Sequence, residues 1–235
     1  MAMTLLAMAQ AVSDEISFAR PASLFSNPDT TARQMLALAN REGMEQASEG
    51  YWQELRRAGT ITTVASQQAY TLPADYDRMI SMTIWSQGQR WPLLGPLTPQ
   101  EWAWQTNGFV AAGPRTRFRI MQGSVYLWPI PSSVDTIVYE YESTGWAFNG
   151  TTYTAQWAND TDTFALNEQV FMLGLKWRLL AAKSLGHDQE KLTWRNALDR
   201  AMGRDAGNRT LHMGGVTSGA RLLGWQNIPS GGYGA

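Results

Sequence analysis

Pairs of carboxylates at short spacing are the side chains of this sequence best suited to catalysis. Glu45 and Glu49 stand four residues apart, so a helix would place them on one face. Asp75 and Asp77 alternate before a strand and would share one side of it. Two carboxyl groups at a suitable separation can hydrolyse a glycosidic bond, but such pairs are also common as solvated surface residues. We therefore expect no catalytic residue and keep a cell-wall glycosidase as an alternative function.

Metal-binding chemistry has little raw material in this chain. The sequence contains no cysteine and two histidines, His187 and His212, which argues against thiolate metal sites, zinc sites and a histidine-based triad. Asp160-Thr161-Asp162 could begin a calcium loop, but the glycine and the distant glutamate of such a loop are missing. We predict a protein without a metal site and without a cofactor, and we expect His187 to lie near carbonyl groups at a helix C-terminus.

Three arginines form a basic stripe. Arg115, Arg117 and Arg119 alternate, so a strand would present all three on one face. They would either face a channel, toward DNA or an acidic neighbour, or belong to a solvated edge whose surface ion pairs discourage aggregation between strands.

The composition indicates a soluble protein rich in aromatic residues. The 235 residues are 44% hydrophobic and 17% charged, and 19 Lys and Arg against 20 Asp and Glu give a net charge of -1. A module that binds DNA by neutralising phosphates is normally basic, so this balance argues against one. No apolar run is long enough to span a membrane. Eleven tryptophans suggest large cores or interfaces, because rigid aromatic side chains concentrate there.

Residues 1–58 are predicted to form the N-terminal helices of a bundle. An apolar stripe from Leu5 to Ile16 favours a short packed helix over a signal peptide. Asn27-Pro28-Asp29 is typical of a helix start, and the helix is expected to run to Arg57-Ala58. Gly43 and Gly50 would interrupt it, which suggests a kink or a close neighbour at each.

Residues 59–164 are predicted to form an antiparallel β domain. Six or seven short strands alternate with turns, which favours a small sandwich or open barrel. Thr98-Pro99-Gln100-Glu101 has the form of a capping box and should open a short helix within this domain. Gln122-Gly123-Ser124 should turn a hairpin. One of the strands is expected to run without a break over Met79 to Trp85.

Residues 144–163 look like a long polar loop within this domain. Such loops are uncommon in compact domains unless they are functional. The stretch is either an extended hairpin with exposed rings or a finger that contacts another subunit or the tail. Four isolated aromatic residues would make the contacts: Trp146, Phe148, Tyr153 and Trp157.

The C-terminal part should complete the helical bundle and then extend as a tail. Over residues 165–203, Asn167 caps a helix with apolar spacing of three and four, and Asp188 starts a second, so the two form an αα-hairpin. Residues 204–235 lose this period, and nine of the 21 glycines fall within the last 33 residues. They nevertheless carry an apolar cluster, which favours a tail that orders on a partner. The fold class is therefore α+β: helices from both chain ends, a small antiparallel sandwich or barrel, and an extended C-terminal tail.

Four segments, in this order, resemble the head-to-tail adaptor proteins of tailed bacteriophages, the family of the tail accessory factor and of tail tubular protein A. The resemblance covers roughly residues 28 to 210 and rests on these segments: Tyr70-Thr71-Leu72-Pro73-Ala74-Asp75-Tyr76-Asp77-Arg78 before a strand that ends in Trp85, Trp128-Pro129-Ile130-Pro131, Tyr139-Glu140-Tyr141, and Leu173-Gly174-Leu175-Lys176-Trp177-Arg178.

The resemblance implies a structural virion protein and not an enzyme. Such adaptors form a dodecameric ring under the portal, continue the DNA channel toward the tail nozzle or another tail protein, and take part in DNA ejection without sequence-specific DNA binding. The ring is assembled in the host cytoplasm, and the C-terminal extension grips the portal. Carried onto this chain, the portal-binding residues are Arg221, Leu222, Leu223, Trp225, Ile228 and Tyr233. A β-sandwich module that binds carbohydrate through its tryptophans is a further alternative.

Overall fold

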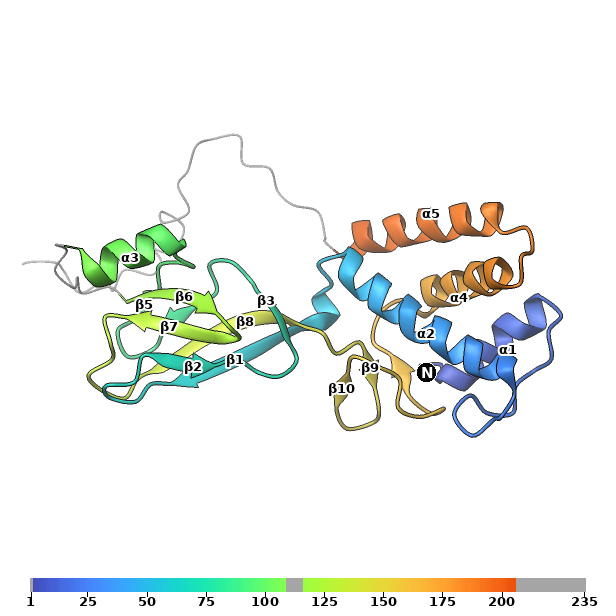
Figure 1. Cartoon of the computed structure of the whole chain (residues 1–235), viewed down its shortest axis with the longest axis horizontal. Coiled ribbons are helices and arrows are strands. Elements are labelled where there is room, and N and C mark those ends of the chain that lie inside the picture. The colour runs from blue at the N-terminus through green and yellow to red at the C-terminus, as the bar shows by residue number, and fades with distance from the viewer. Residues whose placement is uncertain (1, 109–115, 206–235) are drawn as a thin grey trace, which may run out of the picture.

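The computed structural model describes residues 2–108 and 116–205, which form an elongated molecule with a helical lobe at one end and a β lobe at the other (Figure 1). Helices from both ends of the chain build the helical lobe, and most of the strands between them build the β lobe. The predicted α+β class, with a helical bundle and a small antiparallel β domain, is therefore confirmed. None of the helices in the described ranges has the length and apolar character needed to cross a membrane.

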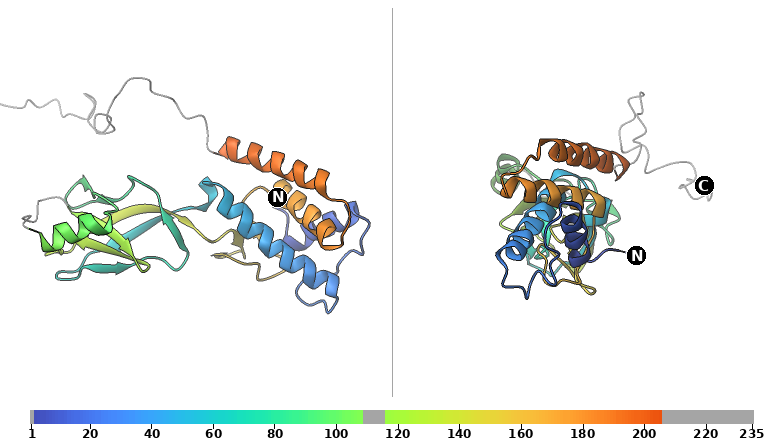
Figure 2. Two further views of the ribbon diagram at one scale, coloured as in Figure 1. Left: turned by 45° about the horizontal axis from the view of Figure 1, so that its top comes forward. Right: turned by 90° about the vertical axis from the view of Figure 1, so that its right-hand side faces the viewer.

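Four helices form the helical lobe, with α4 at its centre. They are α1 (Leu5–Glu15), α2 (Thr30–Glu49), α4 (Glu168–Ala182) and α5 (Asp188–Asp205). Helix α4 packs against the other three, so the N-terminal helices and the C-terminal hairpin share one apolar core. In the end view, α5 lies at one edge of the lobe and α1 and α2 at the other, with α4 between them (Figure 2). The expected bundle and the expected cap at Asn167, which accepts the N–H of Val170, are both present.

Helix α2 is shorter than the sequence predicts. It begins at Thr30, after Asn27 accepts the backbone N–H of Asp29, and it ends at Glu49 instead of Arg57-Ala58. Gly50 follows in an extended conformation and is packed against Met202 of α5, where a Cβ atom would lie 3.2 Å from the side chain. A short 3-10 turn (Gln53–Leu55) then leads into β1 (Arg56–Thr62), whose seven residues all pair with β8. Pairing with β8 thus replaces the last two turns expected of the helix.

Two antiparallel sheets form the β lobe. The first sheet is built on β8 (Thr136–Ser143), which pairs along its length with β1. On its other side, β8 pairs with β4 (Trp85–Ser86) near its start and with β3 (Tyr76–Met79) at its end. Strand β4 also pairs with β5 (Trp91–Pro92). The second sheet has the order β2 (Ala69–Thr71), β7 (Ser124–Trp128), β6 (Arg117–Met121). A bridge between Leu94 and Arg117 joins the sheets along one side. Residues Met79 to Trp85 do not form the single strand expected of them, because the chain turns between β3 and β4.

The local signals within the β lobe are confirmed. Helix α3 (Pro99–Asn107) begins with the predicted capping box, in which Thr98 accepts the N–H of Glu101 and the Glu101 carboxylate accepts the N–H of Thr98. Gln122 and Gly123 connect β6 to β7 with positive φ angles at both residues, as a two-residue hairpin turn requires.

A third, small sheet lies against the helices and not in the β lobe. It contains β9 (Ala147–Phe148), β10 (Tyr153–Thr154) and β11 (Thr163–Phe164), with β9 in the middle. Ala147 and Phe164 are buried in the same apolar core as α1, α2, α4 and α5. The β lobe has a separate core, formed by residues between Ile61 and Tyr141. The expectation that residues 144–163 project as a loop of the β domain is therefore wrong, because this segment closes the core of the helical lobe.

Candidate functional site

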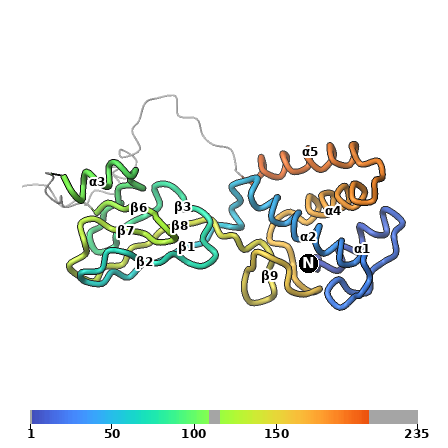
Figure 3. Tube along the Cα trace, in the orientation of Figure 1, coloured from blue at the N-terminus to red at the C-terminus, as the bar shows by residue number. Residues whose placement is uncertain are grey.

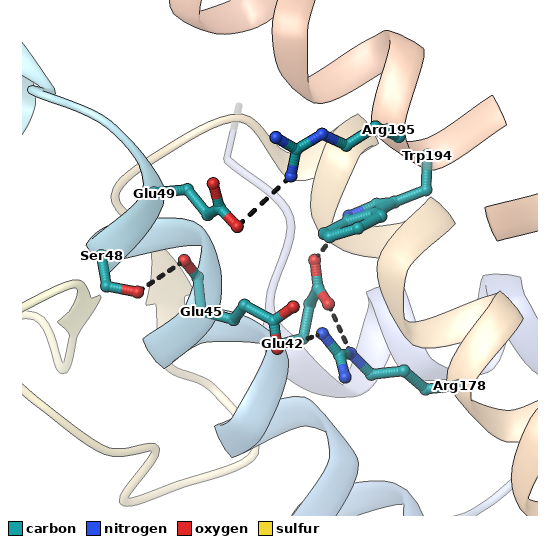
Figure 4. Close-up of polar contacts among 7 residues, drawn as sticks. All are labelled: Glu42, Glu45, Ser48, Glu49, Arg178, Trp194 and Arg195. Atoms are coloured by element: carbon teal, nitrogen blue, oxygen red, sulfur yellow. Dashed lines mark hydrogen bonds and ion pairs between the residues drawn. The ribbon is translucent and has the colours of Figure 1, made fainter. Parts of the chain in front are cut away.

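A carboxylate with no exposed surface, that of Glu42, lies at the centre of the helical lobe. Helix α2 places it there because Glu42 shares the helical phase of the buried Met35, Ala39 and Gln46. The Nε atom of Arg178 on α4 donates to one carboxylate oxygen at 2.7 Å, and the indole N–H of Trp194 on α5 donates to the other at 2.8 Å (Figure 4). Glu42 thus joins three helices through two hydrogen bonds.

Two glycines give this part of the lobe its close packing. A Cβ atom at Gly174 of α4 would lie 2.0 Å from the carboxylate of Glu42, and one at Gly43 of α2 would lie 2.4 Å from the ring of Trp146. Real Cβ atoms do not approach other atoms so closely. The close neighbour predicted at Gly43 is therefore confirmed, and Gly174 allows α4 to lie directly against the buried carboxylate.

Burial changes the acidity of Glu42. Removal from water raises the pKa of its carboxyl from 4.5 to about 7, against the opposing effect of the hydrogen bonds from Arg178 and Trp194. Since solvent and substrates do not reach the group, its perturbed pKa does not make it a general acid or base for an external molecule. The hydrogen bonds of Glu42 instead hold α2, α4 and α5 together.

The first pair of candidate catalytic carboxylates is engaged in ion pairs between helices. Glu45 lies 2.7 Å from Nη2 of Arg178, and Glu49 lies 3.3 Å from Nη1 of Arg195 on α5 (Figure 4). The two carboxylates thus pair with arginines of different helices and do not converge on one position where a glycosidic bond could sit.

Of the second pair of carboxylates, Asp75 ties the loop before β3 to strand β8. Asp75 accepts hydrogen bonds from the hydroxyl of Tyr141 at 3.1 Å and from that of Ser143 at 2.7 Å. Burial and the neighbouring Asp75 carboxylate raise the pKa of the Tyr141 phenol to about 12. Asp77 instead lies 4.0 Å from Arg78, so the two carboxylates have separate partners.

The candidate calcium residues hold the start of α1 and the loop after α1 in place, and their backbone carbonyls accept the N–H groups of Leu5 and Leu6. Asp160 accepts the hydroxyl of Ser23 at 2.6 Å and the N–H of Leu24 at 2.9 Å. Asp162 accepts the backbone N–H groups of Ala158 and Asn159. Within residues 2–108 and 116–205, no three histidine or acidic side chains gather as a metal site would need.

His187 occupies the turn between α4 and α5, as expected. Its Nδ1 lies 3.0 Å from the carbonyl oxygen of Leu185, just beyond the end of α4, and its ring stacks on Trp177.

Two of the four predicted contact aromatics are core residues. Trp146 is 2% exposed and Trp157 is 4% exposed, and their rings meet edge to face at 5.2 Å among Phe164 and Phe171. Their assignment to an exposed finger is wrong, because the small sheet folds them inward onto the helices. Tyr153 is 43% exposed and packs against Phe148, so this second pair does reach the surface.

Two of the three arginines of the predicted basic stripe lie within the described residues. Arg117 is half-buried and donates to Gln105 of α3 at 2.9 Å, and Arg119, two residues further along β6, is half-buried as well. Arg115 lies outside the described residues. So do all six predicted portal-binding residues: Arg221, Leu222, Leu223, Trp225, Ile228 and Tyr233.

Arg78 forms a polar junction between the two lobes that the sequence did not reveal. The chain crosses between the lobes at residues 50–56 and again at residues 143–147 (Figure 3). The Arg78 guanidinium forms an ion pair with the buried Glu142 of β8, donates to the carbonyl of Gly50 at 3.3 Å, and lies 3.9 Å from the ring centroid of Tyr51. It therefore connects β3 and β8 to the end of α2.

Sequence reasoning also missed Glu42 and Arg178, although the signal was present. Each is a charged residue at a helical position whose neighbours three or four residues away are apolar, as Ala39 is for Glu42 and Leu175 is for Arg178. Charged residues at buried positions require a partner. The two positions together would have predicted a buried ion pair between α2 and α4.

A comparison with protein families found a match across nearly the whole chain. The family model described as SU10 adaptor protein matches residues 3–219, a range that includes both lobes. No curated protein matches the chain.

Proposed function

The chain belongs to the SU10 adaptor protein family, whose members are structural phage proteins, and from that membership we propose that it is the head-to-tail adaptor of a tailed phage. In this proposal the protein forms a ring that joins the portal to the tail and continues the DNA channel. The ring is dodecameric, is assembled in the host cytoplasm and remains in the virion. The observation that carries the proposal is the match over residues 3–219, because it includes the helical lobe and the β lobe together.

The charge balance supports a role as a conduit. A net charge of -1 leaves little general attraction for the phosphates of DNA, so DNA could slide through a ring of these subunits without strong retention. Passage of this kind needs no base-specific contact. A basic channel would bind DNA more tightly and would slow its ejection.

The paired state of the candidate catalytic carboxylates supports a role without catalysis. Glu45 and Glu49 face arginines of the bundle, and Asp75 bonds with Tyr141 and Ser143. Neither the glycosidase nor the carbohydrate-binding alternative is favoured by a particular observation, and two of the tryptophans that a glycan would need, Trp146 and Trp157, are buried.

The C-terminal segment is proposed to bind the portal. On the opposite side of the ring, the tail nozzle or another tail protein is proposed to bind. Helix α5 ends at Asp205, just before this segment in the sequence, and the Asp205 carboxylate accepts the N–H of Gln53 at 2.9 Å. The end of α5 is thereby fixed to the helical lobe. Burial of one large apolar side chain contributes roughly 1.5–3 kcal/mol of binding free energy. In this proposal Leu222, Leu223 and Trp225 are such anchors, and because they are repeated around a ring, their burial can offset the conformational entropy that the segment loses when it becomes ordered.

The experiment that tests this proposal is truncation after Asp205. The shortened chain keeps all the described helices and strands, so we expect it to fold with an unchanged circular dichroism spectrum. We expect it to lose binding to the purified portal of the same phage in a pull-down, whereas the full chain binds. A matched full-length control with Leu222, Leu223 and Trp225 replaced by serine should also lose binding. Retained binding by the truncated chain would refute the role of the segment, and absence of the full chain from purified virions would refute the adaptor function.

A further inference from the structure

The sequence contains two asparagines that are followed by glycine, Asn107-Gly108 and Asn149-Gly150. At such a pair the backbone nitrogen of the glycine can attack the side-chain carbonyl carbon of the asparagine, because glycine has no Cβ atom that would hinder the close approach. The attack releases ammonia and closes a cyclic imide. How readily the folded protein reacts in this way depends on the hydrogen bonds around each pair, and the two pairs differ in them.

Asn149 and Gly150 lie in the exposed turn that joins β9 to β10, at the edge of the molecule (Figure 1). The side-chain oxygen Oδ1 of Asn149 accepts the backbone N–H of Thr151 at 3.0 Å and that of Thr152 at 2.8 Å. This oxygen becomes negatively charged during the attack, and two N–H groups at such distances stabilise the charge as an oxyanion hole does. The turn therefore holds the required donors in place before the reaction begins.

The hydroxyl of Thr152 lies beside the leaving group of this reaction. The amide nitrogen Nδ2 of Asn149 donates to Oγ1 of Thr152 at 3.1 Å. The nitrogen can leave as ammonia only after it has taken up a proton. A hydroxyl in contact with it can deliver that proton and recover another from water. The turn thus places a proton donor next to the bond that must break.

The backbone nitrogen of Gly150 is available as the nucleophile. Within the described residues its N–H forms no hydrogen bond, and a Cβ atom at this position would meet no atom within 4 Å. The φ angle of Gly150 is +90°, which glycine adopts without strain. In the other pair, the N–H of Gly108 donates to the carbonyl of Trp104 at 2.9 Å and caps the end of α3. The two pairs therefore share a sequence, but only the first has a free nitrogen.

We propose that Asn149 is a site of spontaneous deamidation built into the β9–β10 turn. Hydroxide removes the proton from the nitrogen of Gly150, which then bonds to Cγ of Asn149 while Oδ1 takes the negative charge. The bond from Cγ to Nδ2 breaks, and ammonia leaves with a proton supplied through the hydroxyl of Thr152. Water then opens the cyclic imide at either of its carbonyls, so residue 149 becomes aspartate or isoaspartate. Overall, water is consumed, ammonia is released, and no atom is oxidised or reduced.

The modification changes the surface beside the turn. It adds one negative charge, and an isoaspartate also lengthens the backbone by a methylene group. Phe148 and Tyr153 flank the turn as a cross-strand pair whose ring centroids lie 4.8 Å apart. The guanidinium carbon of Arg57 in β1 lies 4.2 Å from the centroid of the Tyr153 ring. A longer turn therefore shifts a surface pair that contacts the first strand of the β lobe.

Ageing of the purified full-length protein tests the proposal, with Asn107 as the internal control. Peptide mapping by mass spectrometry measures deamidation at both asparagines, in buffer and in urea. In the folded protein we expect Asn149 to deamidate at least about tenfold faster than Asn107, whereas in urea the two rates should be similar because both local structures are lost. A folded protein in which Asn149 reacts no faster than Asn107 would overturn the proposal. The measurement does not involve the portal or the ring, so its outcome is independent of the adaptor function.

Variants at two exposed threonines separate the role of the Thr152 hydroxyl from mere exposure of the turn. Thr152→Val removes the hydroxyl but keeps the backbone N–H, and we expect it to slow deamidation of Asn149 roughly tenfold. Thr152→Ser keeps a hydroxyl and should react like the wild type.

Thr151→Val is the matched control for Thr152→Val. The backbone N–H of Thr151 donates to Asn149, but within the described residues its hydroxyl forms no hydrogen bond, so the rate should not change. Equal rates for Thr152→Val and Thr151→Val would show that exposure alone governs the reaction and would overturn the proposed site.

Discussion

Gly174 of α4 leaves the space that the carboxylate of Glu42 on α2 occupies. A Cβ atom at position 174 would lie 2.0 Å from that carboxylate. The carboxylate cannot turn aside without losing the hydrogen bonds from Arg178 and Trp194. Glycine therefore stands within α4, where it lowers helix propensity by roughly 1 kcal/mol relative to alanine, because the packing requires it.

Gly174→Ala should destabilise the protein even though alanine favours helices. Inserting a methyl group into a closely packed interior usually costs about 1–3 kcal/mol, which exceeds the gain in helix propensity. Urea unfolding monitored by circular dichroism measures the difference. Gly203→Ala on α5 is the matched control, since a Cβ atom there meets nothing within 4 Å, and it should leave stability unchanged or raise it. An unchanged urea midpoint for Gly174→Ala would contradict the observed packing.

The buried carboxyl of Glu42 should make stability depend on pH. Its pKa is about 7 in the folded protein and near 4.5 when exposed, so between these values the folded state binds more protons than the unfolded state. The contribution of this group to the free energy of unfolding is complete below pH 4.5 and falls as the pH rises toward 7. The loss is on the order of 3 kcal/mol, at 1.36 kcal/mol per pKa unit.

Glu42→Gln isolates this contribution, because the amide keeps the size of the side chain and does not titrate. We expect the free energy of unfolding of the wild type, relative to the variant, to decrease between pH 4.5 and 7 and to level off above that range. Urea titrations at several pH values provide the measurement. Parallel pH profiles for the two proteins would show that Glu42 does not titrate in this range.

Trp146 should contribute far more to stability than its position in a polar segment suggests. It packs in the helical core against Trp157 and Phe164, so Trp146→Ala should cost about 3–5 kcal/mol. Trp104 of α3 is 58% exposed, and Trp104→Ala should cost less than about 1 kcal/mol. Chemical denaturation of both variants checks the contrast. Equal effects would mean that the small sheet does not hold Trp146 in the core.

Local signals in the sequence predicted the helices and turns better than they predicted which core each segment joins. The capping box at Thr98, the cap at Asn167 and the hairpin turn at Gln122-Gly123 depend on neighbouring residues alone, and all three are present. The end of α2 depends on β8, which begins more than 80 residues later, and the burial of Trp146 depends on α2, whose Gly43 lies 103 residues earlier. Sequence spacing carries no information about such partners.

For the candidate site too, sequence spacing identified the residues but did not identify their partners. The carboxylate pairs of Glu45 with Glu49 and of Asp75 with Asp77 were identified by spacing, but distant elements supply the arginine partners of the first pair and the hydroxyl partners of Asp75. Arg178 lies within the segment that carried the resemblance to adaptor proteins, yet its role as the partner of Glu42 appears only when α2 and α4 are brought together.

Arg78 should hold the two lobes in one relative orientation. Its guanidinium contacts Gly50 and Tyr51 at the end of α2 and forms an ion pair with Glu142 of the β lobe. Arg78→Met keeps much of the apolar stem but removes these polar contacts and leaves the Glu142 carboxylate, 4% exposed, without its cation. An unpaired buried group of this kind costs about 1–3 kcal/mol.

We expect Arg78→Met to show a lower unfolding midpoint, a larger radius of gyration by small-angle X-ray scattering, and faster proteolysis within residues 50–56. Arg90→Met, at an exposed position of the β lobe, is the control and should match the wild type in all three measurements. If Arg78→Met matched the wild type as well, the orientation of the lobes would have to depend on the two connecting segments alone.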